Sequence, residues 1–94
     1  MKEAAVEKYL RERVEALGGL CEKFTSPGRR GVPDRLITWP GGRMELVETK
    51  SPRGGLRVAQ YRDHERRAER GVRVYVLYSK SEVDGYIASQ VRSR

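Results

Sequence analysis

Apolar residues recur at helical spacing in two segments of the chain. Between residues 3 and 17 they are Val6, Leu10, Val14 and Leu17, and between residues 81 and 92 they are Val83, Ile87 and Val91. Both patterns are typical of amphipathic helices, and Gly18-Gly19 predicts the end of the first. Residues 57–70 predict a further, polar helix that ends before Gly71.

Four shorter segments predict strands. They are residues 20–25, 34–39, 43–50 and 72–78. The last of them reads Val-Arg-Val-Tyr-Val-Leu-Tyr and is expected to be the most clearly buried strand. Pro40-Gly41-Gly42 predicts a hairpin between the second and third strands. Two segments rich in Pro and Gly, residues 26–33 and 51–56, predict loops.

This order of elements predicts a small α/β fold. A helix precedes three strands, and a second helix then connects the third strand to the fourth. A hairpin followed by a strand–helix–strand crossover gives a mixed sheet, and such crossovers are right-handed in nearly all proteins. With 94 residues and no internal repeat or linker-like segment, the chain is expected to form one domain over residues 1–94.

The charge balance points to a polyanionic partner. The chain has 20 Lys and Arg against 13 Asp and Glu, a formal net charge of +7, and 15 of its basic residues are Arg. Arg presents a planar fork that matches phosphate oxygens. Many small soluble proteins are basic as well, so charge alone does not identify the partner.

No pattern in the chain predicts a membrane-spanning or secreted protein. No segment approaches the ~20 consecutive apolar residues of a spanning helix, and residues 1–5 lack the apolar core of a signal peptide. Cys21 is the one cysteine, so no internal disulfide can form, and we expect it to be a small buried apolar residue. These features predict a cytoplasmic protein of a bacterium or a phage-infected host.

The candidate chemistry lies in Asp34 and in Glu48-Thr49-Lys50, at the outer ends of the two hairpin strands. Residues two apart in a strand share a face, so Glu48 and Lys50 point the same way. A two-residue turn would pair Asp34 with Thr49, on the other face. A three-residue loop pairs Asp34 with Glu48, and Pro at the first loop position with Gly at the left-handed position favours this second register.

That register predicts a metal site. It gives one face of the hairpin the residues Asp34, Leu36, Thr38, Met44, Leu46, Glu48 and Lys50. The Cβ atoms of directly opposed residues lie about 4.5–5.5 Å apart, and two carboxylates at that distance repel unless a proton or a cation lies between them. Oxygen ligands and a nearby phosphate are what Mg²⁺ prefers. Lys50 could then stabilise charge that builds on a phosphate.

These residues resemble a known family. Gly31-Val-Pro-Asp34, followed by Glu48-Thr-Lys50 and then by Gln60, resembles the PD-(D/E)XK nuclease superfamily. The Gly-x-Pro-Asp sequence and the downstream Gln are most similar to its VRR-NUC group, and the resemblance covers essentially the whole chain. It implies a restriction-endonuclease-like αβββαβ core, in which helices flank a mixed sheet.

The resemblance also implies roles for individual residues. Asp34 and Glu48 would bind Mg²⁺ or Mn²⁺, with the main-chain carbonyl of Thr49 as a further ligand. Lys50 would be the catalytic lysine, and Gln60 would support the site.

The family places a glutamate of the first helix at the site as well. Glu7 is our candidate, because it shares a helical stripe with Leu10, Val14 and Leu17. Glu3 lies one turn earlier on the same stripe and is the alternative, although it is close to the chain terminus.

Each candidate also has an ordinary structural interpretation. Asp34 could cap a turn, and Glu48 and Lys50 could line a solvated strand edge. His64 is more often a packed residue than a general base at such a position. Trp39 could be a core residue, a dimer contact or a base-stacking residue, and we favour packing.

The polar helix of residues 57–70 has a weak apolar stripe. We expect its inward face to be Tyr61, His64 and Ala68, with Arg67 where an aliphatic residue would be usual. Such a helix is weakly anchored in a lone monomer, and a partner subunit or DNA could cover it.

Basic residues flank both loops that border the candidate site. Lys23, Arg29, Arg30 and Arg35 surround the first loop, and Arg53 and Arg57 surround the second. Clustering at both loops favours contact with phosphates over ordinary solvation. No helix carries residues at base-reading spacing, so we expect recognition of backbone and shape.

These features together predict a Mg²⁺-dependent endodeoxyribonuclease. Relatives of this size resemble Holliday-junction resolvases of DNA repair, which implies branched DNA such as four-way junctions as the substrate and a homodimer as the working unit. The alternative is a non-catalytic, basic nucleic-acid-binding module with the same fold. A protein–protein adaptor is a third reading, for which the sequence offers no positive feature.

Overall fold

Four strands form one mixed sheet in the order β1-β2-β3-β4. The computed structural model describes residues 2–92, and the expected order of elements is confirmed. Its helices and strands are α1 (Glu3–Ala16), β1 (Leu20–Lys23), β2 (Arg35–Thr38), β3 (Met44–Thr49), α2 (Val58–Ala68), β4 (Val74–Leu77) and α3 (Lys80–Arg92). β1 and β3 pair antiparallel with β2, and β4 pairs parallel with β3.

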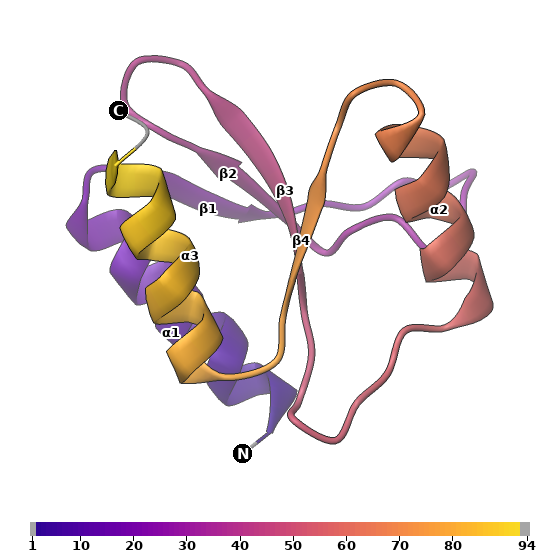
Figure 1. The fold of residues 1–94 in the computed structure, drawn as a ribbon, viewed down its shortest axis with the longest axis horizontal. Helices are drawn as coiled ribbons and strands as arrows, with labels where there is room; N and C mark the ends of the chain where they lie inside the picture. The colour runs from indigo at the N-terminus through magenta and orange to yellow at the C-terminus, as the bar shows by residue number, and fades with distance from the viewer. Residues whose placement is uncertain (1, 93–94) are drawn as a thin grey trace.

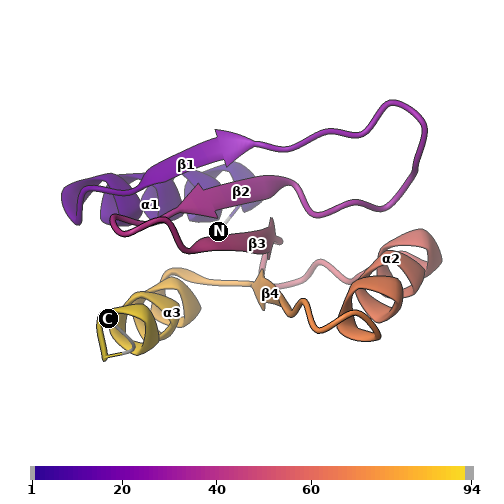
Figure 2. The ribbon, with the colours of Figure 1, turned by 90° about the horizontal axis from the view of Figure 1, so that it is seen from above.

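The helices form two layers around this sheet. α1 and α3 lie side by side on one side of it, and α2, which connects β3 to β4, lies on the other side towards one end (Figures 1 and 2). The αβββαβ core implied by the resemblance is therefore present, with α3 added after it.

The hydrophobic core lies between the sheet and the pair α1 and α3. Strand residues alternate between faces, and Ile37 of β2 and Val47 of β3 point into this core. Its other fully or nearly buried members are Val6, Leu10, Val14, Trp39, Leu77, Val83, Tyr86 and Ile87. The packing expected for Trp39 is confirmed, and its Nε1 donates a 2.9 Å hydrogen bond to Glu45 Oε1.

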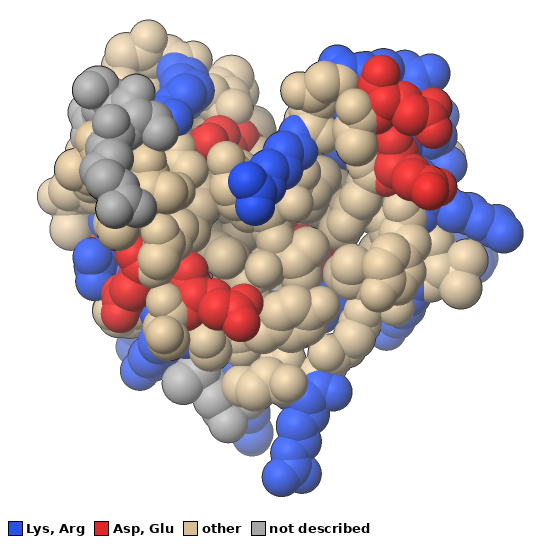
Figure 3. Space-filling model, viewed as in Figure 1, with Lys and Arg blue, Asp and Glu red and all other residues tan. Residues whose placement is uncertain are grey.

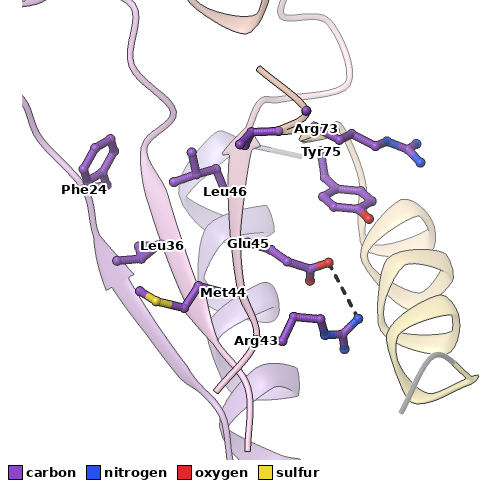
Figure 4. A pocket seen from close by; sticks show the side chains of 10 residues that line it. Phe24, Leu36, Arg43, Met44, Glu45, Leu46, Arg73 and Tyr75 are labelled. Atoms are coloured by element: carbon purple, nitrogen blue, oxygen red, sulfur yellow. Dashed lines mark ion pairs between the residues drawn. The ribbon is translucent and has the colours of Figure 1, made fainter. Parts of the chain in front are cut away.

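The opposite face of the sheet is largely open. A cavity of about 500 Å³ lies along it, and Phe24, Leu36, Met44 and Leu46 project together on this side of β3 (Figure 4). The face is apolar, as the hairpin register predicted. It is not a closed core, because α2 covers only one end of the sheet.

Two expectations about burial are wrong. β4 is an edge strand in which only Leu77 is buried, because within residues 2–92 no further strand pairs with its outer side. Val91 of α3 is 49% exposed, because the last turn of the helix buries Gln90 and turns Val91 outwards. Cys21 is a free thiol, half-buried against the core, and burial raises its pKa to about 11.

The inward face of α2 also differs from the expected stripe. Tyr61 is 60% exposed and Ala68 is exposed, whereas Asp63 is buried and His64 and Arg67 are half-buried. The helix is turned so that polar residues face the end of β3. None of the helices within residues 2–92 is long and apolar enough to cross a membrane.

Candidate active site

The hairpin between β2 and β3 has the three-residue loop expected from the sequence. Leu36 pairs with Leu46, and Trp39 N–H donates a 2.8 Å hydrogen bond to Arg43 O across the loop. Two successive glycines with positive φ close the turn, a conformation that a residue with a Cβ rarely adopts. Continued by one position past Arg35 and Val47, this register sets Asp34 opposite Glu48.

The Asp34 carboxylate turns towards Thr49. Its Oδ1 accepts a 3.2 Å hydrogen bond from the Thr49 N–H, and its Oδ2 accepts a 3.0 Å hydrogen bond from Thr49 Oγ1. We expected strand alternation to hold Asp34 on the face of Glu48. β2 begins only at Arg35, so the Asp34 side chain is free of that alternation and lies across the end of the strand.

Thr49 therefore contributes more than a carbonyl group. Its side chain is buried, and its N–H and hydroxyl both fix Asp34. In a strand the N–H and C=O of one residue point to the same side. The Thr49 carbonyl oxygen consequently faces the side of β3 on which Asp34 lies.

Glu48 is a buried carboxylate in which only one oxygen accepts a hydrogen bond from the described residues. It is 3% exposed, and its Oε2 accepts a 3.2 Å hydrogen bond from Gln60 Nε2. Its Oε1 is buried and has no hydrogen-bond partner within residues 2–92. His64 Nε2 lies 3.9 Å from this oxygen.

The pKa of both carboxyl groups is raised. Burial raises the pKa of Glu48 to about 8, the negative charge of Asp34 adds to this, and the Lys50 ammonium partly offsets it. Burial also raises the pKa of Asp34, although its hydrogen bonds to Thr49 favour the charged form. A cation bound between the buried Glu48 and the half-buried Asp34 would favour the charged form of both carboxyl groups.

Gln60 connects α2 to this pair. Its Oε1 accepts a 2.8 Å hydrogen bond from the Arg57 N–H at the start of the helix, while its Nε2 bonds Glu48. One side chain thus caps the helix and orients the carboxylate.

The loop before Asp34 packs tightly on the same helical turn. Gly31 has a φ of +80°, and a Cβ there would lie 2.3 Å from Ala59 O. Pro33 is fully buried. The Gly-x-Pro sequence therefore fixes the loop to α2 and sets the direction from which Asp34 enters the site.

These residues fit a hard divalent cation. The available donors would be the Asp34 and Glu48 carboxylates and the Thr49 carbonyl, all oxygen, and Glu48 Oε1 is a buried acceptor without a partner among the described residues. In residues 2–92, no three His, Cys, Asp or Glu side chains form a metal-binding cluster by themselves. A cation that keeps several waters and binds substrate phosphate, as Mg²⁺ does, needs no such cluster.

Comparisons with known proteins identify the family. The model of the VRR-NUC domain family matches residues 1–81, which include all of the residues above. The chain belongs to the VRR-NUC family. It is 44% identical over 80 residues to "Putative nuclease p44" of Acyrthosiphon pisum secondary endosymbiont phage 1, covering 85% of this chain and 86% of that protein.

A solved structure described as a VRR_NUC domain has the same fold. It superposes with a TM-score of 0.86 at 43% identity, covering 94% of this chain and 96% of that one. The family and fold implied by the sequence motifs are confirmed, and this VRR-NUC chain is a nuclease domain that acts on nucleic acid.

The two candidate glutamates of α1 in the VRR-NUC chain have different surroundings. Glu7 forms a 2.9 Å ion pair with Arg35. Glu3 is the α1 residue whose negative charge raises the pKa of both Asp34 and Glu48. Glu3, our alternative, therefore acts electrostatically on the acidic pair, whereas Glu7 is engaged by Arg35.

Five of the six expected DNA-contacting residues are exposed, and one is not. Lys23, Arg29, Arg30, Arg53 and Arg57 are all exposed around the two loops. Arg35 is not, because its side chain is 18% exposed and paired with the glutamate of α1.

Asp63 is a buried residue near the site that we did not select. Arg67 Nε lies 2.7 Å from its Oδ2, and Arg66 approaches its Oδ1 at 3.6 Å. Its charge raises the pKa of Glu48 and opposes the lowering that burial causes for His64. The i, i+4 spacing of Asp63 and Arg67 was the available signal.

Proposed function

We propose that this VRR-NUC domain is a Mg²⁺- or Mn²⁺-dependent endodeoxyribonuclease that hydrolyses phosphodiester bonds. The observation that carries the proposal is the buried Glu48 carboxylate. Its Oε1 has no partner among the described residues, and Asp34 and Lys50 both act on its pKa. An unpaired buried acceptor beside a second acid is costly unless a cation binds there.

Different residues of the chain would bind the cation, position its ligands and stabilise charge on the phosphate. Asp34, Glu48 and the Thr49 carbonyl would hold the cation, and Gln60 would keep Glu48 in position. A bound divalent cation lowers the pKa of water and neutralises developing negative charge. The Lys50 ammonium would stabilise the charge that builds on the phosphate as water attacks phosphorus and the 3′-oxygen leaves.

The basic loops support DNA as the substrate. Arg29 and Arg30 precede Asp34, and Arg53 and Arg57 follow Lys50, so exposed positive charge borders the site on both sides. Contacts of this kind read backbone and shape. We propose branched DNA, such as a four-way junction, as the preferred substrate.

The open sheet face supports a homodimer. Leu20 and Met44 are each 56% exposed, and both pair with Thr38 across the sheet and therefore share its face. A second copy packed there would give the dimer two active sites, one for each of the two DNA strands. Met44→Lys should give a monomer in sedimentation velocity, whereas Val91→Lys on α3 should not. A wild-type chain that sediments strictly as a monomer contradicts this part of the proposal.

A cleavage panel tests the activity. The chain is incubated with four-way, flap, nicked and linear DNA in Mg²⁺, Mn²⁺, Ca²⁺ or EDTA, and product ends are mapped. We expect cutting with Mg²⁺ or Mn²⁺ only. Asp34→Asn and Lys50→Ala should each slow it by about 100-fold or more, while Lys8→Ala on the exposed side of α1 should not.

The rival function predicts a different outcome of the same panel. Salt-sensitive binding without cutting in every metal would favour a non-catalytic nucleic-acid-binding module. The intact acidic pair and its adjacent lysine support the nuclease over this rival.

A further inference from the structure

Two adjoining cavities lie between the loop of residues 26–33 and α2, outside the acidic pair. One has a volume of about 400 Å³ and the other about 310 Å³, and Arg29 and Arg66 line both. Their arginines are Arg29, Arg30, Arg62, Arg66, Arg67 and Arg70. We call this surface the arginine groove. Lys and Arg side chains project along the outer side of α2, at the right of Figure 3.

The groove has a large excess of positive charge. Asp63 is the one acid that lines it, and that carboxylate is buried and already held by Arg66 and Arg67. Within residues 2–92, the guanidinium groups of Arg29, Arg30 and Arg62 have no ion pair or hydrogen bond. Glu65 and Glu69 of α2 do not line either cavity.

Like charges gathered in this way repel one another, and an anion bound between them removes the repulsion. The guanidinium is also the group that binds phosphate through two parallel hydrogen bonds. The chemistry of the groove therefore fits phosphate better than a single carboxylate or an apolar ligand.

The spacing fits a row of phosphates rather than one. Arg62 and Arg66 lie about one turn apart on α2, about 6 Å along its axis, and Arg70 follows just past the end of the helix at Ala68. One strand of B-DNA advances about 3.4 Å along the axis for each phosphate. Arg62 and Arg66 alone therefore span about two consecutive phosphates.

The groove is continuous with the approach to the site. Gly31 packs on Ala59, so the loop that carries Arg29 and Arg30 forms one wall of the groove and then leads directly into Asp34. A duplex whose cut phosphate lies at the acidic pair would therefore have this wall along its path.

We propose that the arginine groove binds consecutive backbone phosphates of the duplex arm that flanks the cut. The identity of the ligand as DNA rests on the proposed nuclease function, whereas the phosphate chemistry rests on the groove itself. Arg62 and Arg66 on α2, and Arg70 just past its end, thereby extend the DNA-contacting surface beyond the two loops.

Binding without cleavage tests the proposal. Fluorescence anisotropy with a labelled duplex in EDTA gives the affinity over a range of NaCl concentrations. The double variant Arg62→Ala/Arg66→Ala should bind at least about tenfold more weakly, and its plot of log affinity against log salt should be shallower by about 2, near 0.9 per phosphate contact. Arg62→Lys should keep the slope, because it keeps the charge.

The matched control removes the same charge elsewhere. Lys8→Ala/Arg11→Ala lies on the exposed side of α1 and should leave the slope as in the wild type. Equal slopes for the groove variant and this control would overturn the proposal. Thermal unfolding checks that both double variants are folded.

Two further probes distinguish backbone phosphates from terminal phosphates, and phosphate from carboxylate polyanions. A circular duplex without ends should show the same loss for the groove variant, and a loss confined to linear DNA with a 5′-phosphate would overturn the backbone assignment. Polyglutamate that competes as well as DNA would overturn the phosphate assignment.

The cleavage panel tests the proposed nuclease function separately from the groove. If binding depends on the arginine groove but the chain cuts no DNA, the proposed nuclease function is refuted and the proposal about the groove stands. If the chain cuts DNA but the groove variant binds as the wild type does, only the proposal about the groove is refuted.

Discussion

Gln60 Nε2 donates a 3.2 Å hydrogen bond to Glu48 Oε2, and the same side chain accepts a hydrogen bond from the first turn of α2. This link joins the crossover helix to the end of β3, where the candidate chemistry lies. The position of Glu48 thus depends on a helix that has few apolar contacts with the sheet, and the link can be tested directly.

Gln60→Ala should weaken both functions of the side chain. Loss of the helix cap should cost about 1 kcal/mol of stability. Loss of the bond to Glu48 should lower Mg²⁺ affinity by about 10- to 100-fold, the usual effect of removing a partner of a metal-binding carboxylate. Urea unfolding and a Mg²⁺ titration of cleavage measure the two effects. Tyr61→Ala, at the neighbouring exposed position, should change neither.

Glu48 should make the metal-free protein less stable as pH rises. Its pKa is 4.5 when unperturbed and about 8 in the fold, so between these pH values the folded chain keeps a proton that the unfolded chain loses. Unfolding then releases a proton, and the free energy of unfolding falls by up to about 1.4 kcal/mol for each pH unit. The raised pKa of Asp34 acts in the same direction.

Glu48→Gln should flatten that dependence and stabilise the metal-free protein at pH 8. Urea unfolding in EDTA across the pH range measures it. Glu22→Gln, at an exposed position of β1, should retain the wild-type slope. A Glu48→Gln slope equal to that of the wild type would contradict the raised pKa.

Gly31→Ala should disrupt the loop that precedes Asp34. A Cβ at this position would lie 2.3 Å from Ala59 O, and the φ of +80° adds strain. We expect a loss of about 1–3 kcal/mol. The control is Gly28→Ala in the same loop, where no atom lies within 4 Å of the added Cβ. Equal unfolding midpoints for the two variants would show that the close packing is absent in solution.

Arg67→Ala should destabilise the fold by about 3 kcal/mol, because it removes the closest partner of a buried carboxylate. Asp63 is 1% exposed, and Arg67 Nε lies 2.7 Å from its Oδ2. Arg70→Ala should cost far less, since Arg70 pairs with Glu69 on the surface. Denaturant unfolding of the two variants measures the difference. Similar losses would mean that Asp63 is held mainly by Arg66.

The elements and the hairpin register could be predicted because they depend on local chemistry. Val6, Leu10 and Val14 mark the buried face of α1 by their spacing alone. Pro40 at the first loop position followed by two glycines favours the three-residue loop, and that loop sets Asp34 opposite Glu48. The motif residues and their family followed from the same short segments.

The side-chain partners could not be predicted in this way. Spacing placed Glu7 on the inward stripe of α1, but Arg35 of β2 lies against it and pairs with it. Strand alternation placed Asp34 beside Glu48, but β2 begins one residue later and the carboxylate turns to Thr49. Each outcome depends on a residue from another element.

The sequence by itself determined the order of elements, the register of the hairpin and the identity of the motif, because turn chemistry and periodicity act over a few neighbouring residues. Only the tertiary structure decided which face of α2 turns inward. There Asp63 is buried and Tyr61 is exposed, against the apolar pattern, because the hydrogen bond from Gln60 to Glu48 of β3 and the ion pairs of Asp63 within α2 outweigh the transfer of one aromatic ring from water. The open sheet face and the arginine groove arise from the same packing.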